Sequence, residues 1–86
     1  MSGPAAQVIL YTREGCHLCD EAREGLFEML AAGAGFELHE VDIESDDSLH
    51  RRLLERIPVV EVNGALVCEL IFDPDAVAAR LATFEA

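Results

Sequence analysis

The sequence predicts an α/β fold with the element order β-α-β-α-β-β-α and a four-stranded mixed sheet. Three features indicate it: an apolar run followed by an amphipathic stretch near the N-terminus, an Asn-Gly pair between two apolar runs, and an Asp-Pro pair before the last amphipathic stretch. Strands joined by a crossover helix are parallel and right-handed, whereas an Asn-Gly turn joins antiparallel strands. We therefore expect helices on both faces of the sheet.

The first half of the chain predicts a strand, a helix and a second strand. Residues 7–11 are apolar without alternation, which is typical of a strand buried on both faces. Residues 17–32 have apolar side chains at helical spacing, and the glycines at 33 and 35 end that helix. Residues 36–43 have the composition of a strand. The apolar face of the first helix is expected to contain Leu18, Ala22, Leu26, Met29 and Leu30.

The second and third helices are predicted from their start signals. Ser45 is expected to cap the second helix, with acidic residues following in its first turn. Pro58 ends this segment, and Asp73 followed by Pro74 begins the last helix. The expected core positions are Leu49, Leu53 and Leu54 in the second helix and Val77, Leu81 and Phe84 in the third.

Between these two helices lies a predicted hairpin. Residues 59–62 and 66–71 flank Asn63-Gly64, a strong short-range hairpin signal. In the second strand, Leu66, Cys68 and Leu70 share one parity and are expected to face the core.

Length and charge limit the possible functions. We expect residues 1–86 to form a single domain. The net charge of −11, with seventeen acidic residues against six arginines, argues against nucleic acid and against an anionic membrane surface as partners. No apolar run approaches the ~20 residues that span a bilayer, and no secretory signal is recognisable. We therefore expect a cytoplasmic protein, and a monomer.

The cysteines carry the main chemical signal. In a reducing compartment, Cys16 and Cys19 in a Cys-x-x-Cys pattern indicate metal or redox chemistry rather than a structural disulfide. A zinc site needs four ligands, and the spacing of Cys68, His39 and His50 does not suggest that they converge with the pair, so no metal is expected. Cys68 is expected to be a small buried hydrophobe, and both histidines to lie at or near the surface.

The position of the pair favours redox chemistry. Cys16 precedes the first helix, where unpaired amide groups and the helix dipole stabilise a thiolate, and such pairs reach pKa values of roughly 3.5–7.5. Cys19 lies one turn further on, near enough to form a disulfide, and is expected to be more buried and less nucleophilic.

The chain resembles the glutaredoxins and glutaredoxin-like proteins, the smallest form of the thioredoxin fold. The resemblance rests on four segments: residues 10–19 (LYTREGCHLC), residues 56–60 (RIPVV), Asn63-Gly64 and residues 73–75 (DPD). It implies that Cys16 attacks, that Cys19 resolves and that Pro58 is cis. Three segments depart from the usual glutaredoxin pattern: His17-Leu18, Arg56-Ile57 and residues 70–72 (LIF), where small residues usually allow close approach of glutathione.

The resemblance also assigns binding roles. Arg13 and Arg56 are expected either to hold a carboxylate of glutathione or a peptide, or to be solvated. Arg13 is also expected to tune the thiolate of Cys16, as is His17. Asp75, and less so Asp73, would receive the amino group of glutathione, with helix capping as the alternative. The Ile57 backbone beside Pro58 would pair with a bound peptide.

His17 has two interpretations. If it is protonated, it would stabilise the thiolate of the neighbouring Cys16; otherwise it is an exposed first-turn residue with weak influence.

The predicted function is thiol–disulfide exchange on disulfide-containing proteins or glutathione disulfides. We expect no bound cofactor; glutathione as co-substrate or a thioredoxin-reductase-type donor supplies electrons. The resemblance also leaves open an iron–sulfur cluster held between two subunits with glutathione, as in some glutaredoxins. The alternative function is a non-catalytic, redox-responsive binding module.

Overall fold

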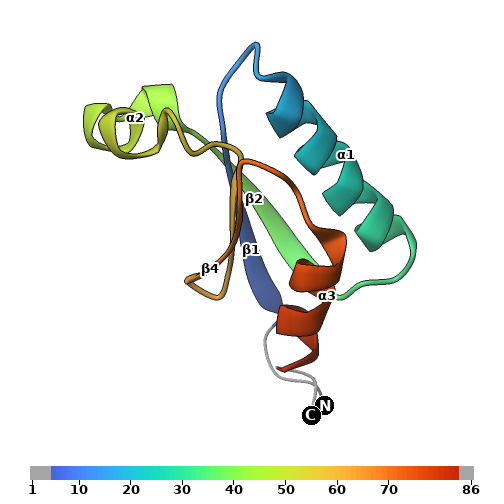
Figure 1. The fold of residues 1–86 in the computed structure, drawn as a ribbon. Coiled ribbons are helices and arrows are strands. Elements are labelled where there is room, and N and C mark those ends of the chain that lie inside the picture. The colour runs from blue at the N-terminus through green and yellow to red at the C-terminus, as the bar shows by residue number, and fades with distance from the viewer. Residues whose placement is uncertain (1–4, 84–86) are drawn as a thin grey trace.

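The computed structural model describes residues 5–83 and has the predicted order of elements. Figure 1 shows the sheet running between two groups of helices. The elements are β1 (Ala6–Thr12), α1 (His17–Ala31), β2 (Phe36–Asp42), the short 3₁₀ helix η1 (Ile43–Ser45), α2 (Asp47–Leu53), β3 (Val59–Val62), β4 (Ala65–Glu69) and α3 (Pro74–Ala82).

The four strands form one mixed sheet in the order β2-β1-β3-β4. β1 is central: it pairs in parallel with β2 through the α1 crossover and antiparallel with β3. β3 and β4 form the expected antiparallel hairpin. Asn63 (φ 49°) and Gly64 (φ 85°) are both left-handed, as a two-residue type I′ turn requires. The carboxyl ends of β1 and β2 therefore lie at the same edge of the sheet.

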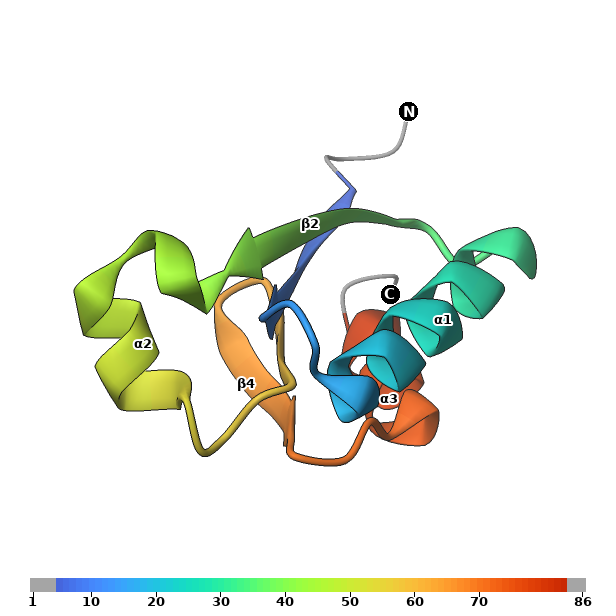
Figure 2. The ribbon, with the colours of Figure 1, turned by 90° about the horizontal axis from the view of Figure 1, so that it is seen from above.

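Helices cover both faces, as the sequence predicts. α1 and α3 pack on one face, and α2 lies on the other side, an arrangement that Figure 2 shows from above. Because side chains alternate along a strand, Leu10 and Val60 face α1 and α3, while Tyr11 and Val59 belong to the cluster that contains Leu53 of α2. The larger cluster contains Val8, Leu10, Ala22, Leu26, Phe36, Val60, Val62, Cys68, Val77 and Leu81.

The buried stripe of α1 differs from the predicted one at its start. Cys19, Ala22 and Leu26 are fully buried, at spacings of three and four residues. Leu18 was expected on this face but is 44% exposed. The cause is that Cys19 occupies the inward position of the first turn, and adjacent helical residues point about 100° apart.

The cap of α2 also differs from the prediction. Asp46, not Ser45, is the N-cap, and its carboxylate accepts the N–H groups of Ser48 and Leu49 at 2.8 and 3.1 Å. Ser45 instead ends η1, and its hydroxyl donates to the Asp42 carbonyl. A carboxylate caps well here because it accepts two of the amide donors that a helix start leaves unpaired.

In β4, the outer strand of the hairpin, Leu66 does not face the core as predicted. Val60 is opposite Cys68, but Glu61 is opposite Leu66, so β4 carries one extra residue at this point. The shift leaves Cys68 in the core and Leu66 50% exposed. β4 also ends at Glu69, so Leu70 (φ 69°) lies outside the strand and is 47% exposed.

The C-terminal helix follows its predicted signals. The Asp73 carboxylate accepts from the N–H groups of Asp75 and Ala76, with Pro74 in the first turn. Val77 and Leu81 are buried; Phe84 lies outside the described residues. Leu54, predicted for the core of α2, is the C-cap residue and is 37% exposed.

The segment between β4 and α3 contacts α1 at Gly25. A Cβ added at Gly25 would collide with the ring of Phe72. Glycine in a helix interior is otherwise unfavourable by about 1 kcal/mol relative to alanine. Its presence at this position therefore allows Phe72 to pack directly on the α1 backbone.

We predict that Gly25→Ala destabilises the protein although it raises helix propensity. Overpacking costs about 1–3 kcal/mol and the propensity gain is about 1 kcal/mol, so a net loss of roughly 1 kcal/mol is expected. Urea unfolding measures it. The control is Glu28→Ala on the exposed surface of the same helix. A rise in the unfolding midpoint for Gly25→Ala would contradict the packing argument.

Candidate functional site

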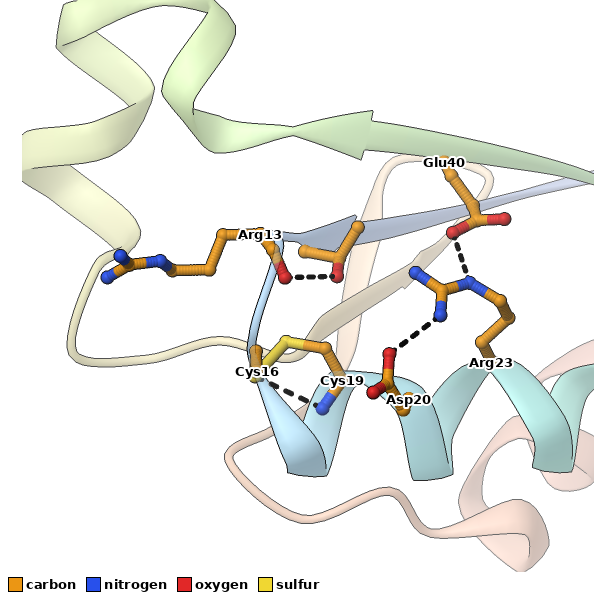
Figure 3. Close-up of polar contacts among 7 residues, drawn as sticks. Arg13, Cys16, Cys19, Asp20, Arg23 and Glu40 are labelled. Carbon is orange, nitrogen blue, oxygen red and sulfur yellow. Dashed lines mark hydrogen bonds and ion pairs between the residues drawn. A yellow bond between two sulfur atoms is a disulfide. The ribbon is translucent and has the colours of Figure 1, made fainter.

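Cys16 and Cys19 form a disulfide at the start of α1, with Cα atoms 5.2 Å apart (Figure 3). Cys16 is the N-cap of the helix, and its Sγ accepts the N–H of Cys19 at 3.1 Å. Gly15, at φ +80°, adopts the left-handed conformation that brings the loop after β1 into the helix. The geometry thus places the sulfur of Cys16 among the unpaired amide donors of a 15-residue helix.

The two cysteines differ in exposure. Cys16 is partly exposed, whereas Cys19 is fully buried. Cys19 packs in an apolar cluster with Ile43, Leu53, Ile57 and Val59, which come from η1, α2, the loop before β3, and β3. A molecule that approaches from solvent therefore reaches the sulfur of Cys16 first, because the cluster shields Cys19.

The predicted proline segment lies beside the pair. The Ile57–Pro58 peptide bond is cis, and Pro58 is fully buried. The Ile57 side chain lies in the cluster that holds Cys19, and its N–H donates to the Leu53 carbonyl at 3.0 Å. The N–H of Leu70 lies 3.0 Å from both the Arg56 and the Pro58 carbonyls. The cis-proline segment is thereby joined to the end of β4.

A network of charged side chains lies on the polar side of the same helix. Arg23 donates through Nε to Glu40 at 2.6 Å and through Nη1 to Asp20 at 2.8 Å (Figure 3). These contacts raise the pKa of Arg23, with the Glu40 hydrogen bond as the largest cause. The network borders an open cleft of about 510 Å³ lined by Thr12, Arg13, Glu14, Gly15, Asp20, Arg23, Glu40 and Asp42.

The basic residues expected to bind a carboxylate both have partners in this structure. Arg13 lines the cleft and forms an ion pair with Glu44 at 3.7 Å. Arg56 donates through Nε to Glu69 at 2.5 Å. Both pairs are partly exposed, and such pairs contribute only about 0–1 kcal/mol, so an incoming carboxylate can compete for either arginine.

His17 and Asp75 are also located by the structure. His17 Nε2 lies 3.1 Å from Glu21 Oε2, with the imidazole 87% exposed, so its ring pairs along the helix surface. Asp75 lies in the first turn of α3 and contributes its N–H to the Asp73 cap. Capping is therefore carried out by Asp73, and a ligand-binding role for Asp75 stays a prediction.

Sequence reasoning missed the network centred on Arg23. Its Asp20–Arg23 part has the i,i+3 spacing of helical ion pairs and was readable from the sequence. The contact between Arg23 and Glu40 cannot be read from the sequence, because it depends on how β2 is placed relative to α1.

Two other kinds of functional feature are absent from residues 5–83. No group of three or more His, Cys, Asp or Glu side chains in this range could hold a metal ion. Within the same residues, no helix has both the length and the apolar character needed to cross a membrane.

A Cys-x-x-Cys disulfide at a helix N-terminus, on this four-stranded sheet, defines a thioredoxin-fold protein. Residues 7–82 match the glutaredoxin-like domain (DUF836), and the chain therefore belongs to this family. A search of curated proteins finds no match.

Solved structures agree with the fold. Protein Ne2328 from Nitrosomonas europaea is 28% identical with a TM-score of 0.77, covering 93% of this chain and 95% of its own. Protein XcR50 from X. campestris is 31% identical with a TM-score of 0.71, covering 88% and 96%. Mitochondrial thioredoxin 3 from Saccharomyces cerevisiae, in its oxidized form, is 16% identical with a TM-score of 0.65, covering 91% and 77%, and shows similarity of fold alone.

The third cysteine gives a prediction about reactivity. Burial raises the pKa of the Cys68 thiol, and its Sγ donates to the Asp73 carbonyl at 3.6 Å. A raised pKa keeps the unreactive thiol form at neutral pH. In reduced native protein, iodoacetamide at pH 7 is expected to modify Cys16 and leave Cys68 unmodified until urea is added. Peptide mass spectrometry reads both sites, and prompt modification of native Cys68 would contradict this.

Proposed function

We propose that this protein is a thiol–disulfide oxidoreductase that reduces disulfides of protein substrates, with Cys16 as nucleophile and Cys19 as resolving thiol. The observation that carries the proposal is the contrast between them: Cys16 is partly exposed at the helix N-cap, and Cys19 is fully buried beneath it. Attack from solvent-accessible Cys16 followed by resolution from Cys19 is the order that this contrast favours.

The chemistry consists of two exchanges. The Cys16 thiolate attacks one sulfur of a substrate disulfide; the substrate S–S bond breaks, and the departing thiolate takes a proton from water. Cys19 then loses its proton to solvent and attacks Cys16 Sγ, which releases the second substrate thiol and forms the Cys16–Cys19 bond. Two electrons pass from the dithiol to the substrate. An external thiol donor, either glutathione or a reductase of the thioredoxin-reductase type, returns them.

Protein disulfides are favoured by the side chains around the pair. Leu18 lies between the cysteines and is 44% exposed. Leu70, whose backbone N–H donates to the Pro58 carbonyl, is 47% exposed. Ile71 next to it is 74% exposed. These apolar groups suit a polypeptide chain better than the polar tripeptide glutathione.

Turnover tests the proposal. The purified protein is expected to reduce insulin disulfides when supplied with glutathione and glutathione reductase, or with thioredoxin reductase, each with NADPH. Cys16→Ser is expected to abolish this rate because the nucleophile is gone. Cys19→Ser is expected to accumulate a mixed disulfide on Cys16, visible by non-reducing mass spectrometry, since the resolving thiol is missing.

The matched control is Cys68→Ser, which removes a thiol outside the pair and should retain turnover. If wild type and Cys16→Ser give the same rate with both donors, the enzyme proposal fails. In that case a redox-responsive binding module becomes the better account, because the disulfide would then serve to change a surface rather than to turn over.

A further inference from the structure

The network of Asp20, Arg23 and Glu40 lies beside the redox pair without taking part in the exchange. Asp20 directly follows Cys19, and its backbone N–H donates to the Cys16 carbonyl at 3.1 Å. Glu40 reaches the same region from β2, the neighbouring strand of β1. Figure 3 shows both carboxylates directed at Arg23, between the helix and the sheet. The network therefore begins at the residue after Cys19 and extends one turn along α1 to Arg23 and across to Glu40 of β2.

The geometry points to Arg23 as a positioning residue that sets the redox poise of the Cys16–Cys19 pair by neutralising the charge of Asp20 and Glu40. This inference rests on the proposed redox role of the pair. Two carboxylates and one guanidinium leave one negative charge in the network; loss of the guanidinium would leave two.

Charge matters here because the two redox states differ in charge. The reduced pair contains a thiolate, and the disulfide contains none. Negative charge close by raises the pKa of the thiol, destabilises the reduced form and makes the pair a stronger reductant. The 31% exposure of the Arg23 side chain means that solvent screens the effect only in part.

Three other basic side chains form pairs of their own with acidic neighbours. Arg13 pairs with Glu44, His17 with Glu21, and Arg56 with Glu69. Further charged groups on the elements packed around the redox pair include Glu14 in the loop after β1, Glu24 and Glu28 on α1, Glu37 and Asp42 on β2, Asp47, Arg51 and Arg52 on α2, and Glu61 on β3. Arg23 is the one arginine of α1 and contacts two carboxylates, which is why its removal changes the charge on this helix most directly.

The test is the dithiol–disulfide equilibrium of the full chain in dithiothreitol redox buffers, with the reduced fraction read by thiol alkylation and mass. Arg23→Met is expected to shift the equilibrium toward disulfide by about threefold to tenfold, or about 15–30 mV for a two-electron couple. The apparent pKa of Cys16, from the pH dependence of iodoacetamide alkylation, should rise with it. Arg23→Lys keeps the charge and should stay close to wild type.

Glu40→Gln separates charge from simple bracing of the helix. Its amide oxygen can still accept from Arg23, but one negative charge is lost, so the equilibrium should shift in the opposite direction. Arg51→Met, on the exposed surface of α2, removes an equal charge elsewhere and should leave the equilibrium unchanged.

Shifts of the same sign in Arg23→Met and Glu40→Gln would overturn the inference and leave only a bracing role. No shift in Arg23→Met would also overturn it. If Arg23→Met does not fold, the opposite-sign shift of Glu40→Gln with an unchanged Arg51→Met supports the inference, and any other result rejects it. The equilibrium needs no protein substrate, so absent turnover would overturn the proposed function and leave this inference standing.

Discussion

Cys19 is fully buried, and the contacts around it join α1 to four other segments of the chain. Its side chain packs with residues from η1, α2, the loop before β3, and β3 itself, while its backbone belongs to α1. Any change that displaces α1 from the sheet therefore also opens the small apolar cluster on the other side. The difference in accessibility between Cys16 and Cys19 depends on this one packing arrangement, and so does the order of the proposed exchanges.

The apolar side of the redox pair is matched by a polar side. Towards α2, Cys19 meets aliphatic groups; towards the ends of β1 and β2, α1 presents Asp20 and Arg23 to an open cleft. A helix placed between such environments holds one sulfur away from water and leaves its charged neighbours hydrated. In a chain of net charge −11, Arg13, Arg23 and Arg56 each offset part of the acidic charge in their own surroundings.

Local signals in the sequence predict the fold well, because each of them acts within a few residues. Asn63-Gly64 specifies its turn and Asp73-Pro74 its helix start through short-range hydrogen bonds and backbone preferences. Features that depend on a second segment were missed. The extra residue in β4 that turns Leu66 outward, and the contact of Phe72 with Gly25, require two segments to be placed before either can be seen.

The same reasoning applies to the candidate site. Cys16 and Cys19 were found because three-residue spacing at a helix start is a local pattern. The choice between Ser45 and Asp46 as cap was wrong because both residues are good caps and only the path of η1 decides between them. The burial of Cys19 also has a consequence for synthesis. Both cysteines leave the ribosome before Ile57 and Val59, so the nascent chain carries two thiols of similar exposure until β3 has been made and packed.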